Sequence, residues 1–131
     1  MYKLTWERGS RGGVVRLTGL FWAFGPSIES FKHCIPVLSV DGTHLYGKYG
    51  GVLLVATGID ANGGLYPLAF VVVSVENDAN WTWFFACMHS MIPSLRGRPE
   101  ITFISDRMKG MKMDSKLVGN HGIIKDFVCV I

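Results

Sequence analysis

The sequence lacks any apolar run of about 18 residues, the length that a helix needs to cross a bilayer. Its start also lacks the apolar stretch behind a basic cluster that marks a secretory leader. We therefore expect neither membrane spanning nor secretion. Cysteines are few, odd in number and widely spaced, so we expect buried thiols in a reducing compartment. No zinc site is predicted, because the spaced Cys and His pairs that such a site needs are missing. The three cysteines are Cys34, Cys87 and Cys129.

Charged residues are also sparse, at 18% of the 131 residues, whereas apolar residues make up 49%. This composition excludes a disordered chain and suits one domain with a sizeable core. The net charge of +3 is unevenly distributed: residues 1–35 carry five cations and two anions, residues 36–90 one and four, and residues 91–131 seven and four. An acidic middle between basic ends suits a metal-binding core with phosphate-contacting margins, or is ordinary surface charge.

Three strands are predicted in the middle of the chain. Val37–Val40 is short and β-branched and is closed by Asp41-Gly42, which marks either the end of a strand or a hairpin turn. The continuously apolar stretch Tyr49–Thr57 predicts a central strand. The turn residues Asp60–Gly64 connect it to a further apolar run, Leu65–Val75. We expect an antiparallel three-stranded meander.

A helix and a fourth strand are predicted next. Asn77 and Asp78 are good caps for a helix limited by Pro93, and Ile101–Ser105 alternates apolar with polar residues before Asp106. A helix between strands implies a crossover to a parallel partner. The apolar residues of this helix form one stripe, which predicts packing in the core; base stacking is the alternative for the aromatic residues among them. A second, short helix or turn is expected nearer the start of the chain. The stripe is Trp81, Phe84, Phe85, Met88, Met91 and Ile92, and the earlier segment is Ser27–His33.

Two aspartates follow the strands that we expect to be parallel. If these strands are neighbours, Asp41 and Asp106 emerge at the same edge of the sheet, about 5 Å apart in strand spacing. Two such carboxylates repel each other unless a divalent cation lies between them. The arrangement therefore predicts a magnesium site used in phosphoryl transfer, while the alternative is that each Asp only forms a turn.

Several motifs follow one another along the chain: Phe21–Phe24, Asp41–Leu45, Gly47–Tyr49, Gly51–Gly58, Pro67–Phe70, Glu76-Asn77, Trp81–Phe85 and Ile104–Arg107. Together they resemble the catalytic core of plant Mutator-like element (MULE) transposases. The resemblance implies a partial ribonuclease H-like fold of the α+β or α/β class, with three antiparallel strands, a helix and a fourth strand parallel to the first. It also implies DDE chemistry with Mg²⁺ or Mn²⁺, in which Asp41 and Asp106 match the first two acids.

The third acid of the resembled family, a glutamate, lies further downstream, and this chain ends before it. We therefore expect a fragment with impaired catalysis, so that its standing as an enzyme is uncertain. The alternative is a domesticated, non-catalytic DNA- or protein-binding module similar to transposase-derived plant transcription regulators. The resemblance to a transposase implies DNA with terminal inverted repeats as partner, and it implies a nuclear location. The expected division is a basic lead-in with a short helix (1–35), the core (36–112) and a divergent tail (113–131).

Basic residues near the two acids in sequence are the predicted contacts to DNA phosphates, with a solvated surface role as the alternative. They are Lys48, Arg107 and Lys109. His44 either orients phosphate or is structural, and Glu76 is either a further acid of the site or a capping residue. A ribonuclease H-like sheet normally gains a further strand and helices after its fourth strand. Without them the sheet edge beyond Ile101–Ser105 would be uncovered, and we then expect self-association through that edge.

Overall fold

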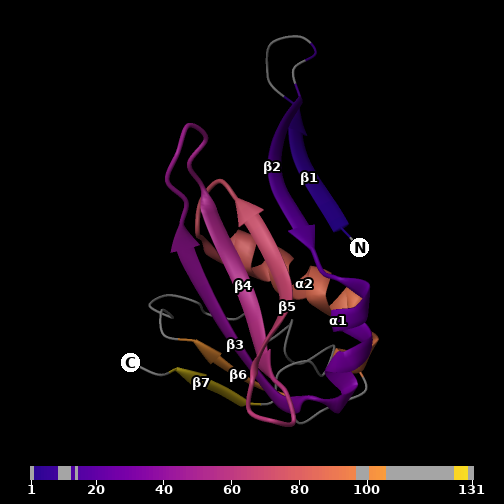
Figure 1. The fold of residues 1–131 in the computed structure, drawn as a ribbon. Helices are drawn as coiled ribbons and strands as arrows, with labels where there is room; N and C mark the ends of the chain where they lie inside the picture. Colours follow the sequence, from indigo (N-terminus) through magenta and orange to yellow (C-terminus); the bar gives the residue numbers. More distant parts are fainter. Residues whose placement is uncertain (1, 9–12, 14, 97–100, 106–125, 130–131) are drawn as a thin grey trace.

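The computed structural model describes residues 2–8, 13, 15–96, 101–105 and 126–129. Seven strands form one mixed sheet in the order β1-β2-β5-β4-β3-β6-β7, with α2 against one face (Figure 1). No helix in the described ranges is long and apolar enough to span a membrane. The elements are β1 Tyr2–Arg8, β2 Val15–Trp22, α1 Gly25–Ser30, η1 Phe31–His33, β3 Ile35–His44, β4 Val52–Ile59, β5 Leu65–Val73, α2 Asp78–Met91, α3 Pro93–Arg96, β6 Thr102–Ser105 and β7 Asp126–Cys129.

Strands β3, β4 and β5 form the predicted antiparallel meander. The turn between β4 and β5 is built by Asp60, whose Oδ1 accepts hydrogen bonds from the backbone N–H groups of Asn62 and Gly64. Gly63 has φ +80°, a conformation that glycine adopts without steric cost. Strand β4 alternates buried and half-buried residues between β3 and β5, so it is central in the sheet, as its apolar composition predicts.

Strand β3 does not end at Asp41, and the prediction of a strand end or turn there is wrong. The antiparallel register with β4 continues through Asp41 opposite Val55 and Gly42 opposite Leu54 to the end of β3 at His44. The physical reason is packing on the buried face. A Cβ atom at position 42 would lie 3.0 Å from Leu54 Cδ2 and 3.2 Å from Glu76 Oε1, so this glycine permits close approach within the strand rather than a turn.

Helix α2 covers the buried face of the sheet. Its N-cap is Asn77, whose Oδ1 accepts a hydrogen bond of 2.8 Å from the backbone N–H of Asn80, as the sequence predicts. The helix ends at Met91, before Pro93. Its buried side chains are Trp81, Phe84, Phe85, Cys87 and Met88. The aromatic residues of the stripe therefore pack in the core, and base stacking by them is ruled out.

Strand β6 lies beside β3 and runs parallel to it, with Leu38 opposite Phe103 and Ser39 opposite Ile104. The expected order of a meander, a helix and a strand parallel to the first is thus present. Strand β7 in turn pairs parallel with β6 along Thr102–Ser105. The expectation of an uncovered edge beyond Ile101–Ser105 is therefore wrong, and the argument for self-association through that edge no longer applies.

The first 22 residues add two strands that the sequence analysis does not anticipate. Strands β1 and β2 form a hairpin, and β2 also pairs antiparallel with β5, from Gly19 opposite Val73 to Trp22 opposite Phe70. The segment is therefore part of the same sheet as the core. The following α1 and η1 include the short helix or turn predicted at Ser27–His33, and their buried residues are Ile28 and Phe31.

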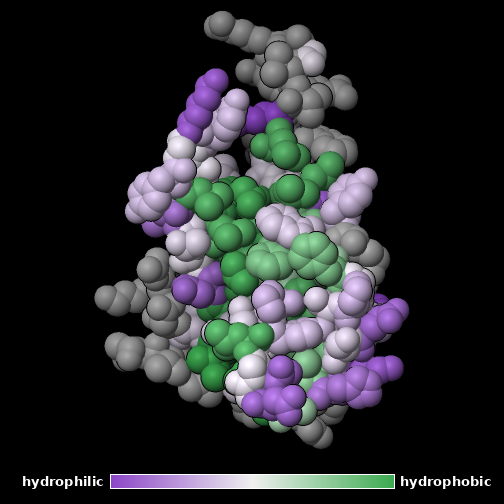
Figure 2. All heavy atoms as spheres, viewed as in Figure 1, coloured by the Kyte–Doolittle hydropathy of each residue, from purple (hydrophilic) through white to green (hydrophobic). Residues whose placement is uncertain are grey.

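The face of the sheet opposite α2 is the one toward the viewer in Figure 1, and Figure 2 shows hydrophobic residues gathered along its middle. Half-buried residues alternate along β4 on this face, and the rings of Trp22 and Phe70 stack there with centroids 5.2 Å apart. We call it the open face. The polar residues of β3 lie at one side of this apolar strip, which places Asp41 next to it.

Candidate functional site

Asp41 lies on β3, beside the central strand β4. Its neighbours Val40 and Gly42 are buried under α2, whereas Ser39, Asp41 and Thr43 are exposed, so Asp41 projects from the open face. One oxygen, Oδ1, accepts a hydrogen bond of 2.8 Å from the backbone N–H of Gly42. The carboxylate is therefore held at one point and presented to solvent, which suits a ligand for a hard cation such as Mg²⁺.

Asp106, the second predicted acid, lies outside the described residues. The strand before it is described: β6 ends at Ser105 and runs beside β3 in parallel register. Phe103 and Ser105 are buried and Ile104 is half-buried, which is the same alternation that β3 has between Leu38 and Val40. The structure thus brings the strand that leads to the second acid directly beside the strand that carries the first.

Glu76 lies on the other face of β3 from Asp41. Its carboxylate packs against Gly42, and Oε1 accepts a hydrogen bond of 3.1 Å from the indole Nε1 of Trp81. This contact answers the alternatives left open by the sequence. Glu76 links the start of α2 to β3, and the sheet separates it from the open face, so it is a structural residue and not a further acid beside Asp41.

The predicted phosphate contacts are only partly described. Lys48 is exposed on the loop between β3 and β4, and its Nζ lies 5.5 Å from the centroid of the Tyr49 ring. Arg107 and Lys109 lie outside the described residues. His44, the last residue of β3, is exposed at the start of the same loop. His44 therefore lies at the end of β3 that follows Asp41, and Lys48 lies on the loop just beyond it.

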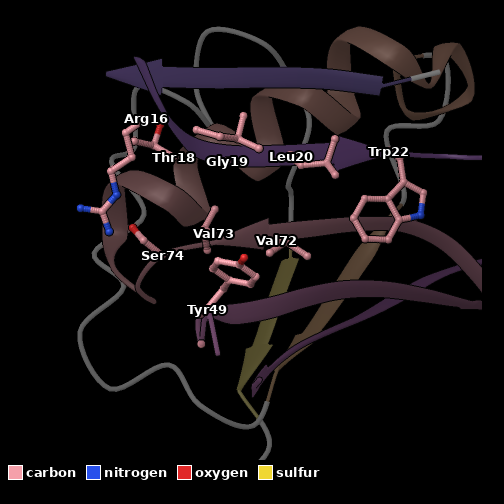
Figure 3. Close-up of a pocket in the computed structure, with 12 residues that line it drawn as sticks. Arg16, Thr18, Gly19, Leu20, Trp22, Tyr49, Val72, Val73 and Ser74 are labelled. Carbon is pink, nitrogen blue, oxygen red and sulfur yellow. The ribbon is translucent and has the colours of Figure 1, made fainter. Parts of the chain in front are cut away.

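Sequence reasoning missed a groove at this end of the sheet. A cavity of about 480 Å³ is lined by residues of β2, by the end of β5 and by the β3–β4 loop (Figure 3). Tyr49 and Arg16 lie toward one end of it and Trp22 at the other. The sequence signal for this groove was Tyr49, which follows a lysine and precedes two glycines. The part played by Arg16 in lining the groove depends on the position of β2, which the sequence did not predict.

Two of the three cysteines are described, Cys34 and Cys87. Both are buried thiols, as predicted, and the side chain of Cys129 is not among those described. Burial raises the pKa of the Cys87 thiol, although nearby Lys3 acts in the opposite direction. The protonated thiol is therefore favoured, which makes Cys87 a poor nucleophile and a poor metal ligand. Within the described ranges, no group of three or more His, Cys, Asp or Glu residues could hold a metal ion.

Sequence similarity to known proteins bears on the family of this chain. The model of the MULE transposase domain family matches residues 37–119, which covers β3 to β6. The chain is also similar to "Putative protein FAR1-RELATED SEQUENCE 10" of Arabidopsis thaliana, with 28% identity over 97 residues that make up 74% of this chain. It spans 14% of that relative's length. No solved structure matches significantly. Because the family match covers well over half of its residues, this chain belongs to the MULE transposase domain family.

Proposed function

We propose that this segment is the part of a transposase-derived core in which Asp41 and Asp106 hold a divalent metal ion that acts on the phosphodiester backbone of DNA. One observation carries the proposal: β6 pairs parallel with β3, with Ser39 opposite Ile104. If this register continued for two more residues, position 106 would lie opposite Asp41, on the same face of the sheet. We further propose that this arrangement is the opening part of a ribonuclease H-like fold.

The donor chemistry of Asp41 fits such an ion. Mg²⁺ and Mn²⁺ prefer carboxylate oxygens, and Oδ2 of this exposed side chain is not used by the bond to Gly42. When bound, the ion supplies charge neutralisation at the attacked phosphate and lowers the pKa of a coordinated water. The protein's part is to keep Asp41 on a rigid strand between two hydrogen-bonded neighbours, so that the ligand position is fixed before the ion arrives.

Basic side chains complete the proposed site. Lys48 lies on the loop that follows β3, and Arg107 and Lys109 follow Asp106 closely in sequence. Cations near the acids reduce the repulsion between DNA phosphates and the acidic middle of the chain, and they position the backbone without reading its sequence. A protein that acts on chromosomal DNA would reside in the nucleus, which we propose as its location.

The second candidate function is binding without catalysis, in a domesticated module that contacts DNA or protein. The observation that favours it is the β3–β4 loop, where the ring of Tyr49 is 90% exposed and the amine of Lys48 lies 5.5 Å from its centroid. Exposed aromatic and basic residues contribute to binding and need no metal ion. This loop would remain useful in a protein whose acids no longer support turnover.

Metal titration separates the two candidates. We expect Mn²⁺ binding, followed by calorimetry and by paramagnetic broadening of NMR signals on the open face, to be lost in Asp41→Asn and in Asp106→Asn. Asp78→Asn is the matched control, because Asp78 is exposed in the first turn of α2, on the other face of the sheet. If Asp41→Asn binds Mn²⁺ as the parent does, the metal proposal is wrong, and DNA binding that survives would favour the non-catalytic module.

Activity is tested on a DNA duplex with terminal inverted repeats in Mg²⁺ or Mn²⁺. Metal-dependent strand cleavage that disappears in Asp41→Asn and in Asp106→Asn, but not in Asp78→Asn, would support a functional nuclease core. Metal binding without cleavage would indicate that the ancestral ion site is present and that turnover needs residues outside this segment, since displacement at phosphorus is aided by charge on both the attacking and the leaving oxygen.

A further inference from the structure

The groove beside the β3–β4 loop exists because β2 runs past the end of β5. Pairing of these strands begins with Gly19 opposite Val73, the last residue of β5, so residues 15–18 extend beyond it. The β1–β2 register shifts at this point, so that Thr18 lies between Leu17 and Gly19, the partners of Trp6 and Thr5, and its hydroxyl contacts that of Thr5 at 2.9 Å. The space that opens between β2 and the loop is the cavity of about 480 Å³, within the range of ligand pockets.

The loop holds Tyr49 at this groove through its backbone. The N–H of Leu45 donates a hydrogen bond of 2.9 Å to the carbonyl of Gly51, which closes the loop. Gly51 has φ +103°, and a Cβ atom there would lie 2.9 Å from the carbonyl oxygen of Val73. The loop thus approaches the end of β5 as closely as glycine allows, and the exposed ring of Tyr49 lies over the groove beside Val73 and Ser74 (Figure 3).

The lining combines a flat apolar surface with positive charge and hydroxyl groups. Leu20, Val72 and the rings of Tyr49 and Trp22 supply the apolar part, while Arg16 supplies a cation (Figure 3). None of the described residues that line the groove is acidic. The Lys48 amine, 5.5 Å from the centre of the Tyr49 ring, adds a second cation at the same place. Thr18 and Ser74 contribute hydroxyl groups.

We propose that this groove binds single-stranded DNA, with a base stacked on Tyr49 and the adjoining phosphates at Arg16 and Lys48. A nucleotide has the two properties that the lining complements, a planar aromatic face and negative charge. The base must be unpaired, because bases inside a duplex expose no face for a tyrosine to stack on. The inference rests on the proposed function in one respect, that DNA is the substrate, and it assigns an unpaired stretch of that substrate to this groove.

The test is fluorescence anisotropy of a labelled oligothymidylate with the whole chain in low salt. We expect Tyr49→Ala to weaken binding about 5- to 150-fold, the range that corresponds to loss of one stacked base. Tyr46→Ala is the matched control: it removes a tyrosine of the same loop that is 97% exposed and does not line the groove. Arg16→Gln should lower the slope of log affinity against log salt by about 0.7, the loss of one phosphate contact.

Three results would overturn the inference. They are the absence of binding by the parent chain, equal losses in Tyr49→Ala and Tyr46→Ala, and an equal dependence on Tyr49 when the probe is a duplex of the same length. The proposed function has a separate readout, because Mn²⁺ binding tests Asp41 without DNA. Oligothymidylate binding that persists in Asp41→Asn and is lost in Tyr49→Ala would support the groove even if no metal binds.

Discussion

The indole Nε1 of Trp81 donates a hydrogen bond of 3.1 Å to Glu76 Oε1, and the same carboxylate packs against the backbone of Gly42 in β3. This contact ties the first turns of α2 to the strand that carries Asp41. A shift of the helix along the sheet would break it. The position of Asp41 on the open face therefore depends on packing on the opposite face.

We expect the Trp81–Glu76 hydrogen bond to stabilise the fold by about 1 kcal/mol, because it involves a charged acceptor but lies only partly buried. The measurement is a double-mutant cycle by urea unfolding with Trp81→Phe and Glu76→Ala. Glu76→Gln retains an acceptor oxygen and should cost less than Glu76→Ala. If the single changes in the cycle are strictly additive, the two side chains do not couple and the contact contributes nothing.

Gly42→Ala should destabilise the protein by about 1–3 kcal/mol, the usual cost of overpacking. The added methyl group would lie 3.0 Å from Leu54 Cδ2 and 3.2 Å from Glu76, and neither neighbour can move without disturbing the core or α2. Gly25→Ala is the control, because nothing lies within 4 Å of a Cβ there. Equal free energies of unfolding for the two variants would contradict the described packing at position 42.

Asn77→Ala should lower the free energy of unfolding by about 1 kcal/mol, because it removes the side chain that caps α2 at the backbone N–H of Asn80. Asn77→Asp keeps an acceptor and adds negative charge at the helix N-terminus, so it should be neutral or stabilising. Thermal and urea unfolding of both variants gives the comparison. A loss in Asn77→Asp as large as in Asn77→Ala would show that the cap is not the cause.

The raised pKa of Cys87 predicts a pH dependence of stability. The thiol is protonated in the folded state and ionises more readily when unfolded, where its ordinary pKa is 9.0. The contribution of this thiol to the free energy of unfolding is therefore complete below pH 9 and is lost as the pH rises through its pKa in the folded state. We expect the stability difference between the parent and Cys87→Ala to shrink from pH 8 to pH 10.5. A difference that is constant with pH would mean that burial does not shift this group.

Most of the central sheet could be predicted from sequence, because its signals are local. Apolar continuity in Val52–Ile59, the glycine-rich turn after Asp60 and the stripe of α2 each depend on neighbours along the chain. The prediction that the strand ends or turns at Asp41-Gly42 was wrong because this residue pair is typical of turns. Here Gly42 is needed for close packing with Leu54 and Glu76, which lie 12 and 34 positions further along, so no local signal could reveal it.

The candidate site was predictable only in part for the same reason. The placement of Asp41 follows from the strand that contains it, while the groove combines Arg16 with Tyr49, two residues brought together by the pairing of β2 with β5. Strands β1 and β2 lacked a strong signal because charged residues interrupt Tyr2–Arg8 and because a glycine lies within Val15–Trp22. Strand β7 is too short, at four residues, to be recognised by periodicity.

The pairing of β2 with β5 also has a consequence for the order of folding. The hairpins β1–β2 and β4–β5 each form from nearby residues, but joining Trp22 to Phe70 closes a loop of about fifty residues. During synthesis the β1–β2 hairpin therefore leaves the ribosome well before β5 has been made, and it cannot pair with the rest of the sheet until then. Chain order and assembly order differ here: the amino-terminal strands are made first and are expected to dock late, onto a sheet already nucleated by the meander.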